Sequence, residues 1–378
     1  MRGLLKIAYK LLVNDRGKFA ALLMGITFAV FLMLMMTSVF AGILQKSSAT
    51  VTNTGAKVWV MDPSVNNVLN SIPMPDYVLD AVRSIPGVTY AVPFYSGAAL
   101  VRLPSGRYQA TTVIGLDDTS LFGRPKMIEG NIDDIYAGDS VIVVVDSEYP
   151  KLGRPKVGDS FEINDRRAVV IGLAKTPASG LFGLPTLYTT YSRATEYVPS
   201  PRFTISYVLV EPQDTARIPE IEQAVTKLGY VARTEQEFED TIANFYKYQT
   251  GIGTNILLMT VISFLVGLSI SGQTFYTFVL ENLERFGALK AIGAKGRELV
   301  YMILFQVGVT SFAGYGLGIG LCTLLIFIAK LRLPSYASII TFWNMGLALV
   351  MVLVIAAFSS YLGIRRVLRI EPFDIFRT

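Results

Sequence analysis

Residues 281–298 read ENLERFGALKAIGAKGRE, and the runs on both sides of them, 248–280 and 299–329, contain no Asp, Glu, Lys or Arg. A helix needs about 20 predominantly apolar residues to cross the hydrocarbon layer of a membrane. Each flanking run is longer than that. The charged, glycine-punctuated segment is therefore predicted to connect two membrane-spanning helices, and its position organises the rest of the chain.

Two further charge-free runs, residues 19–45 and 333–364, meet the same length criterion. The first follows a basic segment, as a signal peptide would, but the apolar core of a signal peptide has only about 7–15 residues. No A-x-A cleavage site follows this run, so we read it as an uncleaved span. The four predicted spans are 19–45, 251–280, 299–329 and 339–364.

The composition supports a membrane protein and excludes several classes of enzyme. Hydrophobic residues make up 52% of the 378 residues and charged residues only 17%, whereas about 25% charge is usual in soluble proteins. The chain has no histidine, which excludes histidine-based acid–base catalysis, Ser-His-Asp triads and nearly all zinc enzymes. Its one cysteine, Cys322, cannot form an intrachain disulfide. We expect no metal site and no catalysis by this chain.

The distribution of basic residues indicates the orientation. Segments 1–18, 281–298 and 365–378 carry five, four and four Lys or Arg residues. The loop 330–338, on the other side, carries two. Because cytoplasmic segments are enriched in Lys and Arg, we expect a multi-pass membrane protein with both termini in the cytoplasm. The net charge of +5 is then a topology signal, and no nucleic-acid partner is expected.

Residues 46–250 are predicted to form a large extracytoplasmic α+β domain between the first and second spans. Amphipathic runs at 76–84 and 218–229 indicate helices, and alternating or β-branched runs indicate strands. A further helix, 234–249, contains no helix breaker and should run straight into the second span as a rigid rod. The predicted strands are 57–61, 98–103, 108–116, 140–145, 168–173 and 204–210.

The first residues, RGLLKIAYKLLVN at 2–14, place Arg2, Lys6 and Lys10 on one face of a helix and apolar residues on the other. Such a helix lies in the membrane interface, although an ordinary solvated helix has the same pattern. We assign 1–18 to an amphipathic interfacial helix in contact with the lipid bilayer. The remaining segments are a short external loop, 330–338, and a cytoplasmic tail, 365–378.

Within residues 281–298, an apolar residue recurs at every third position. This spacing indicates a short helix with an apolar stripe. Gly293 and Gly296 should end this helix and return the chain to the membrane. A helix this short is marginal in water by itself. It should therefore dock in a groove of a partner protein or, alternatively, pack on the first span or the membrane interface. The stripe consists of Leu283, Phe286, Leu289 and Ile292.

The sequence LFGRP at 121–125 returns as LFGLP at 181–185. Two similar turns would explain this repetition. The alternative is a pair of exposed apolar tips that contact an external partner or a cargo, and repeated architecture is a third interpretation. The residues concerned are Leu121, Phe122, Leu181 and Phe182.

The third predicted span contains GYGLGIG at 314–320, which holds two interleaved GxxxG pairs. Small residues allow helix backbones to approach closely in lipid. The pairs can therefore serve packing within the chain or a dimer contact, and the pattern alone does not decide between them. The glycines are Gly314, Gly316, Gly318 and Gly320.

The segment ERFGALKAIGAKGREL, bracketed by spans, resembles the cytoplasmic loop of the MacB/FtsX-type ABC permeases, with its G-x-L-K-A-x-G-A core. The tail RRVLRIEPFDIFRT resembles the closing R-x-x-P-x-x-x-L-R of the same family, and the layout matches over essentially the whole chain. Phe286 stands where this family usually has Ile, and Phe376 where it commonly has Leu. Both departures look more like the DevC-like branch of exporter permeases.

The resemblance implies a homodimer whose loop helices dock on a separate ABC ATPase subunit. It also implies that ATP and Mg²⁺ are bound by that ATPase, with no cofactor in this chain, and that a periplasmic adaptor and an outer-membrane duct are possible partners. This chain has no G-x-x-x-x-G-K-[ST] motif for a nucleotide. The implied docking residues are Glu284, Phe286, Gly287, Leu289, Lys290, Ala291, Gly293 and Ala294, with a second contact at Pro372, Phe373 and Arg377.

The expected function is that of the permease subunit of an ABC exporter, in which ATP hydrolysis moves the extracytoplasmic domain and drives efflux by mechanotransmission. The alternative is an FtsX-like signalling subunit that activates a cell-wall hydrolase without transport. A membrane-bound enzyme is a further alternative, for which Asp117-Asp118 and Asp133-Asp134 are the candidate carboxylate pairs. None of the charge-free runs offers a charged relay at membrane depth, which argues against a proton-driven transporter or an ion channel.

Overall fold

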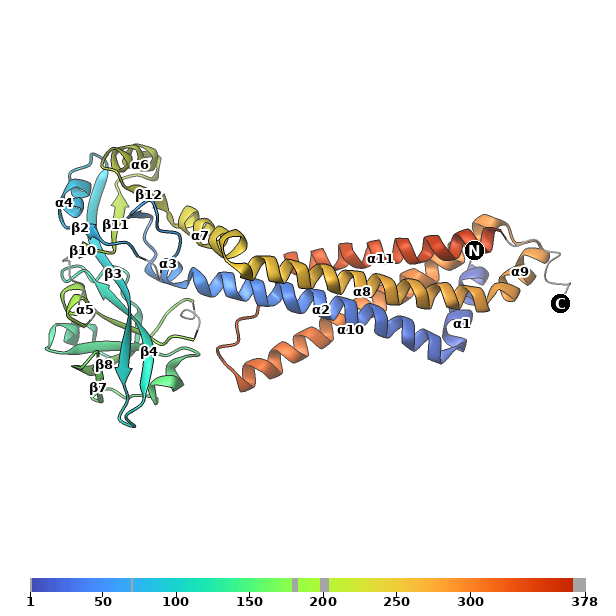
Figure 1. Cartoon of the computed structure of the whole chain (residues 1–378), viewed down its shortest axis with the longest axis horizontal. Helices are drawn as coiled ribbons and strands as arrows, with labels where there is room; N and C mark the ends of the chain where they lie inside the picture. Colours follow the sequence, from blue (N-terminus) through green and yellow to red (C-terminus); the bar gives the residue numbers. More distant parts are fainter. Residues whose placement is uncertain (1, 69–70, 179–182, 198–203, 370–378) are drawn as a thin grey trace. The chain divides into compact units, whose positions relative to one another are not determined.

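The computed structural model describes residues 2–68, 71–178, 183–197 and 204–369. The chain divides into two compact units, and Figure 1 labels most of their helices and many of their strands. The helical unit comprises Met1–Ala41, Gly253–Arg332 and Ser338–Thr378. The sheet unit comprises Gly42–Ile252 and the short segment Leu333–Ala337.

Four helices among the described residues are long and apolar enough to cross a membrane. Together with the large α/β domain between the first and second of them, they confirm the predicted fold class. The helices α2 and α8 extend beyond the helical unit into the sheet unit. The helices of this part are α1 (Arg2–Asn14), α2 (Arg16–Ser47), α8 (Gly251–Glu281), α9 (Leu283–Ala291), α10 (Gly296–Arg332) and α11 (Phe342–Leu368).

The outward faces of these long helices are apolar. Leu257 and Leu258 on α8 and Phe312 on α10 are more than half exposed. A soluble protein would not present such continuous apolar surface to water, whereas lipid is as apolar as these side chains. The exposure therefore agrees with a membrane location for the four helices.

The sheet unit is built on a 10-stranded sheet of mixed direction, counted over the described residues. Its order is β12-β1-β11-β3-β4-β9-β6-β8-β5, with β7 paired to β3 and β8. The pairs β4–β9 and β6–β8 are parallel. The strands are β1 (Val58–Met61), β3 (Val88–Arg102), β4 (Tyr108–Leu116), β5 (Lys126–Gly130), β6 (Ser140–Val144), β7 (Ser160–Ile163), β8 (Arg166–Lys175), β9 (Thr186–Thr190), β11 (Tyr207–Pro212) and β12 (Val231–Thr234), with β2 (Met74–Pro75) and β10 (Thr204–Ile205) in a separate pair.

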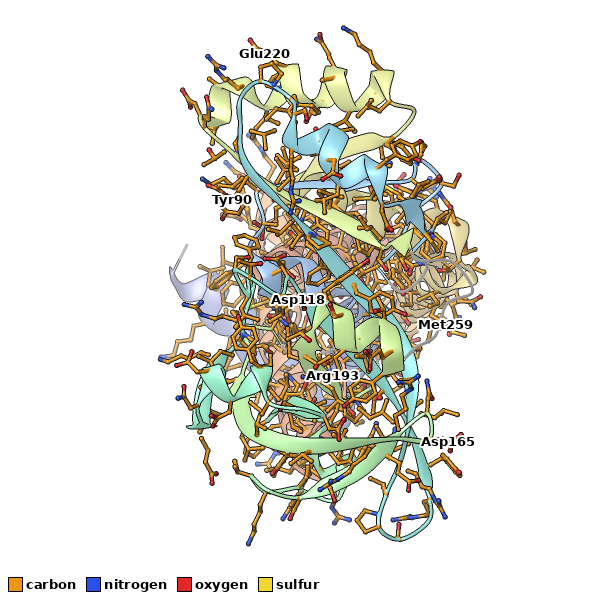
Figure 2. The ribbon with its side chains drawn as sticks, turned by 90° about the vertical axis from the view of Figure 1, so that its left-hand side faces the viewer. Tyr90, Asp118, Asp165, Arg193, Glu220 and Met259 are labelled. Atoms are coloured by element: carbon orange, nitrogen blue, oxygen red, sulfur yellow. The ribbon has the colours of Figure 1, made fainter. Side chains whose placement is uncertain are left out.

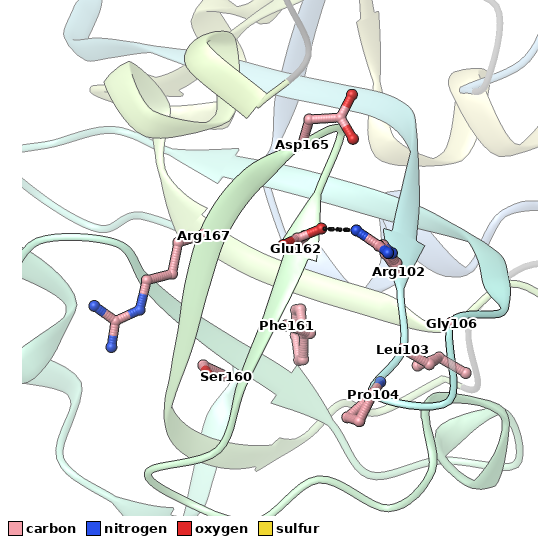
Figure 3. Close-up of a pocket in the computed structure, with 9 residues that line it drawn as sticks. All are labelled: Arg102, Leu103, Pro104, Gly106, Ser160, Phe161, Glu162, Asp165 and Arg167. Atoms are coloured by element: carbon pink, nitrogen blue, oxygen red, sulfur yellow. Dashed lines mark hydrogen bonds and ion pairs between the residues drawn. The ribbon is translucent and has the colours of Figure 1, made fainter.

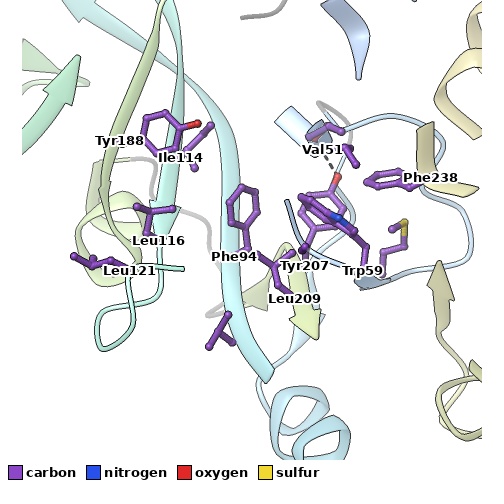
Figure 4. Packing of buried hydrophobic residues seen from close by; sticks show 14 of the residues in the cluster. Val51, Trp59, Phe94, Ile114, Leu116, Leu121, Tyr188, Tyr207, Leu209 and Phe238 are labelled. Atoms are coloured by element: carbon purple, nitrogen blue, oxygen red, sulfur yellow. Dashed lines mark hydrogen bonds between the residues drawn. The ribbon is translucent and has the colours of Figure 1, made fainter. Parts of the chain in front are cut away.

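The long strand β3 joins two halves of the sheet unit. Its first residues pair with β11 and its last residues with β4. One large core packs around Trp59, Phe94 and Tyr207, whose rings meet edge to face or tilted (Figure 4). The Tyr207 hydroxyl donates to the Val68 carbonyl at 3.0 Å, and burial raises the pKa of Tyr207, which keeps it protonated. The helices are α3 (Ala49–Thr54), α4 (Tyr77–Arg83), α5 (Tyr191–Tyr197), α6 (Ile218–Lys227) and α7 (Glu235–Asn244).

The predicted rigid rod from 234–249 into the second span is wrong. The helix α7 ends at Asn244, a π-helical turn covers Phe245–Gln249, and Thr250 is extended, with φ −102° and ψ 153°, before α8 begins. The Thr250 amide donates to the Phe245 carbonyl five residues back at 3.1 Å, and its hydroxyl donates to the Tyr246 carbonyl at 2.9 Å. Residues 245–250, FYKYQT, contain neither proline nor glycine, which is why the pattern missed the interruption.

Candidate coupling site

The helix α9 begins directly after α8 and is held there by Asn282. The buried Asn282 side chain donates from Nδ2 to the Phe278 carbonyl at 2.8 Å and accepts from Arg285 Nη1 at 2.9 Å. The Phe286 amide donates to the Asn282 carbonyl at 3.0 Å. One residue thus joins the end of the second long helix to the first turn of α9.

Phe286 anchors α9 in the interior of the helical unit. Its side chain is 0% exposed and lies in a core cluster with Ala8 of α1, Leu22 of α2, Phe278 of α8 and Val367 of α11. All six helices of the unit contribute buried residues to this cluster. A movement of α9 would therefore disturb the packing of every one of them.

The end of α9 is a Schellman motif. Gly293 has φ +106°, which only glycine adopts without strain. The Ala294 amide donates to the Leu289 carbonyl at 3.0 Å and the Gly293 amide donates to the Lys290 carbonyl at 3.1 Å. Leu289 and Ala294 both pack against the core cluster. The sequence A-I-G-A thus closes the helix and turns the chain toward α10.

The predicted apolar stripe is divided between the interior and the surface. Phe286 is fully buried and Leu283 and Leu289 are partly buried, so the stripe enters the chain's own core. Ile292 is 84% exposed. The face that α9 presents to its surroundings has the spacing i, i+4, i+7 and i+8 of a single helix face. It consists of Glu284, Ala288, Ala291 and Ile292, flanked by Arg285.

Charged side chains tie this end of the helical unit together. Lys18 forms ion pairs with Glu281 and, at 2.8 Å, with Asp15. The hydrogen bond from Lys18 lowers the pKa of Asp15. Lys290 Nζ lies 3.5 Å from the Leu368 carbonyl, where α11 ends. A cation at a helix C-terminus is favourable because of the partial negative charge there.

The residues of the implied docking element therefore fall into distinct groups. Glu284, Ala291 and Gly293 are exposed, Lys290 and Ala294 are partly buried, and Phe286 and Gly287 are buried. Phe286 and Gly287 support the helix from inside and cannot meet a partner in this conformation. The tail residues Pro372, Phe373 and Arg377 lie outside the described residues.

The helix α1 packs against the rest of the chain and does not rest on lipid alone. Ala8 and Leu12 of α1 are fully buried. Gln306 of α10 is fully buried as well and donates to the Ala8 carbonyl at 2.9 Å. Ile7, which the pattern placed on the apolar face, is 42% exposed. Leu4 and Leu11 also pack against the core cluster, so most of the apolar face is used inside the helical unit.

The glycines of α10 divide by face. A Cβ atom at Gly314 would lie 2.7 Å from Ile26 Cγ2, and one at Gly318 would lie 2.7 Å from Val30 Cβ. These two glycines serve packing of α10 on α2. A Cβ at Gly316 or Gly320 would meet nothing within 4 Å, so this second pair lies on an open face.

At 121–125 the structure shows a turn, as the first interpretation of the LFGxP repetition has it, and not the alternative of an exposed tip. Leu121 is 5% exposed and belongs to the large core of the sheet unit, and Phe122 is partly buried with its ring 5.8 Å from that of Tyr90. Leu121 and Gly123 both have positive φ, as a tight turn requires. This LFGxP is therefore a core-facing turn. Leu181 and Phe182 lie outside the described residues.

The Asp-Asp pair at 117–118 is accounted for by local structure. Asp117 accepts from the Ser120 amide and hydroxyl at 2.7 and 2.8 Å, which closes a turn. Asp118 accepts from the Ser192 amide at 3.2 Å, and nearby Arg193 donates to the Ile135 carbonyl at 2.9 Å (Figure 2). Both carboxylates are thus occupied by hydrogen bonds from backbone amides and serine hydroxyls that hold local structure. The geometry therefore gives no support to an enzyme at this place.

A hollow of about 610 Å³ lies beside the turn between β3 and β4 and the neighbouring strand β7 (Figure 3). Arg102 donates to Glu162 at 3.1 Å across it, and Arg167 points away from this pair. Its two arginines are matched by the carboxylates of Glu162 and Asp165. This balance gives the hollow no preference for a charged ligand.

Comparisons with known proteins agree with this architecture. The family model "MacB-like periplasmic core domain" matches residues 19–228, which is more than half of the chain, and "FtsX-like permease C-terminal" matches residues 257–372. The chain is a MacB/FtsX-type ABC transporter permease. The first match places the sheet unit of this permease in the extracytoplasmic part of the family, and the second covers α9 and the helices around it.

Similar proteins include an uncharacterized ABC transporter permease of Mycobacterium tuberculosis, 25% identical over 91% of this permease and 90% of that protein. The putative hemin transport system permease protein HrtB of Staphylococcus haemolyticus is 25% identical over 39% of this chain and 40% of its own. The macrolide export ATP-binding/permease protein MacB of Salmonella paratyphi A is 22% identical over 58% of this chain and 35% of its own.

Proposed function

We propose that this permease is the membrane subunit of an ABC exporter, and that ATP hydrolysis by a separate ATPase subunit moves its sheet unit to drive efflux by mechanotransmission. The observation that carries this proposal is the anchoring of α9. Its inner face is fixed by Phe286 in a cluster to which all six helices of the helical unit contribute. A force on its outer face would therefore reach all of them.

The outer face of α9 has the character of a docking surface. Ala288 and Ala291 are small enough for close approach, and the exposed Ile292 provides an apolar anchor. Glu284 and Arg285 can fix the register by charge. A helix that presents such a face suits the groove of a partner protein. The proposed docking surface is therefore the outer face of α9. The apolar stripe that the sequence predicted for docking is mostly buried.

The partner would supply the chemistry. The chain has no P-loop motif, so ATP and Mg²⁺ would be bound by the ATPase, and this subunit would not itself be catalytic. The basic segments support an orientation in the inner membrane with both termini in the cytoplasm and the sheet unit outside. We further propose that two copies form a homodimer and that a periplasmic adaptor and an outer-membrane duct can join it.

The relatives suggest that the cargo of this family varies. One relative is named for hemin transport and another for macrolide export. We therefore leave the proposed cargo at the level of a small apolar or amphipathic molecule. An FtsX-like signalling role would use the same coupling site but would end in activation of a hydrolase outside the membrane.

The test uses the full-length permease co-expressed with its ATPase subunit. In the variant Ala288→Arg/Ile292→Asp, we expect co-purification of the ATPase to fall about 30-fold, because loss of an apolar hot spot costs about 2 kcal/mol of binding free energy. The matched control, Asn14→Asp, adds a charge to an exposed position at the end of α1 and should bind normally. Unchanged binding and hydrolysis by the double variant would contradict the proposal.

Capture of partners from the native membrane then separates export from signalling. An adaptor and an outer-membrane duct on the sheet unit would support export. A cell-wall hydrolase in their place would overturn export in favour of the signalling role, while the coupling site would stand.

A further inference from the structure

The sheet unit contains a carboxylate that is completely buried. Glu148, which lies just before a 3₁₀ turn at Tyr149–Leu152, is 0% exposed. Its Oε2 lies 2.7 Å from Lys151 Nζ and its Oε1 lies 3.7 Å from Lys46 Nζ. Its Oε1 also accepts from the Ser147 hydroxyl at 3.1 Å. One buried anion is thus surrounded by two cations and a hydroxyl.

These groups come from segments that are far apart in the chain. Lys46 lies in the last turn of α2, and Glu148 and Lys151 follow β6. Lys46 also donates to the Ser335 carbonyl at 2.9 Å, within the segment Leu333–Ala337 that connects α10 with α11. The Lys46 ammonium therefore joins the end of α2, the loop after β6 and the segment Leu333–Ala337, all of which belong to the sheet unit.

The arrangement resists separation because of burial. Removing one member of a buried ion pair leaves an uncompensated charge away from water, which is strongly unfavourable. The Lys46 side chain is only 11% exposed. If the α10–α11 connection moved away, Lys46 would lose its carbonyl acceptor without gaining full hydration in return. The segments that meet at Lys46 should therefore move together.

The group has no access for a substrate. Glu148 is fully buried, and of these residues Lys151 alone borders the neighbouring hollow of about 430 Å³. A general acid or base must reach the atom on which it acts. A mechanical role fits the burial better than a chemical one.

We propose that Lys46, Glu148 and Ser335 form a latch that fastens the α10–α11 connection and the end of α2 to the sheet unit as one mechanical input. This inference rests on the proposed function for its purpose, since a latch matters where movement of the helices is passed to the domain. Its existence can be tested on the permease alone, without ATPase or nucleotide.

The experiment measures how tightly the α10–α11 connection is held. Nitroxide labels are placed at Leu333→Cys and Tyr136→Cys, two exposed positions of the sheet unit, in a Cys322→Ala background and in lipid nanodiscs. The label-to-label distance distribution is measured by pulsed electron paramagnetic resonance. We expect a narrow distribution in the parent protein and at least a twofold broader one in Lys46→Met. Lys151→Met removes the other cation but no contact to Ser335, and should leave the width unchanged.

The conservative variant Lys46→Arg keeps the charge and several donors, and we expect it to restore the narrow distribution. An unchanged width in Lys46→Met would overturn the latch. Equal broadening in Lys46→Met and Lys151→Met would also overturn it, because a general loss of stability would then explain the result.

A second readout separates the latch from the proposed function. With the ATPase present, Lys46→Met should bind it and hydrolyse ATP as the parent does, while export falls at least tenfold. Normal export by a variant whose distance distribution is broad would overturn the mechanical role of the latch. Loss of ATPase binding by Ala288→Arg/Ile292→Asp, measured separately, tests the proposed function and does not depend on the latch.

Discussion

Two helical connections join the helical unit to the sheet unit, and they are built differently. The helix α2 runs without interruption from Arg16 to Ser47, across the boundary between Ala41 and Gly42. The second connection is interrupted by the π-helical turn and by the extended Thr250 between α7 and α8. An uninterrupted helix transmits a displacement along its axis, whereas π-turns and breaks are places where helices bend.

The surroundings of α2 also hold it more firmly than those of the interrupted connection. The end of α2 is held by the buried ion pairs of Lys46 and Glu148. Near the other connection, Tyr248 is 79% exposed and the Thr250 hydroxyl provides the local hydrogen bonds. In the proposed mechanism, α2 would carry movement into the sheet unit and residues 245–250 would act as a pivot. The continuous helix that the sequence predicted at 234–249 is interrupted, whereas α2 is continuous.

The largest expected effect comes from breaking the ion pairs at the end of α2. Glu148→Leu leaves Lys46 and Lys151 without their carboxylate, and we expect the free energy of unfolding of the sheet unit to fall by about 3–5 kcal/mol. The measurement is thermal unfolding of the full-length protein in detergent. Adding Lys46→Met and Lys151→Met should recover most of the loss, because apolar replacement of a whole buried ion network is often neutral. If the triple variant does not recover stability, the loss in Glu148→Leu comes from altered packing and not from the missing carboxylate charge.

A smaller effect is expected where α2 packs on α10. Gly318→Val places a side chain 2.7 Å from Val30 Cβ, and overpacking of this kind costs about 1–3 kcal/mol of stability. Gly316→Val is the matched control, because a Cβ at Gly316 meets nothing within 4 Å. Resistance to unfolding in SDS compares the two. Should Gly316→Val unfold as readily as Gly318→Val, the division of the glycines by face would be wrong. Loss of dimerisation by Gly316→Val alone would place a dimer contact on the open face.

The sequence predicted the elements whose pattern is local. The four spans are visible as charge-free runs, and the alternation at 108–116 matches β4 from Tyr108 to Leu116. The first half of β3 was missed because Pro93 lies inside it and proline usually marks the end of a strand. The short strand β9, TLYTT, was missed because its threonines are polar although the strand is buried.

The sequence predicted where the coupling helix α9 lies, but it did not predict which of its faces is buried and which is exposed. The apolar stripe of α9 looks the same in the sequence whether it enters a partner or the chain's own core. The burial of Phe286 depends on α1 and α2, which lie far before it in the chain, and on α11, which follows it after α10. Nothing in the sequence indicated that Glu148 is buried, since a charged residue in a loop is normally solvated. Both facts depend on tertiary packing, which a local pattern does not contain.

Removing the N-cap of α7 should cost less stability than overpacking the contact between α2 and α10. Thr234 and Glu237 form a complete capping box, with the Thr234 amide donating to Glu237 Oε2 at 2.8 Å. Thr234→Ala should cost about 1 kcal/mol of local stability, seen as roughly fivefold faster hydrogen exchange in α7. Thr226→Ala in α6 is the control, because the Thr226 hydroxyl only bonds back to the Glu222 carbonyl. Equal exchange in both variants would mean that Phe238 and Ile242 hold α7 without its cap.

The smallest effect, and the most direct test of the pivot, is expected at Thr250. Thr250→Ala removes the hydroxyl that donates to the Tyr246 carbonyl and accepts from the Ile252 amide at 3.4 Å. If these bonds hold the interruption, the variant should lose about 0.5–1 kcal/mol locally, and hydrogen exchange of residues 246–252 should quicken about two- to fivefold. Slower exchange would show instead that alanine, a better helix former than threonine, has let α7 and α8 fuse. The two connections would then both be rigid, and export should fall because the domain has lost its pivot while ATP hydrolysis continues.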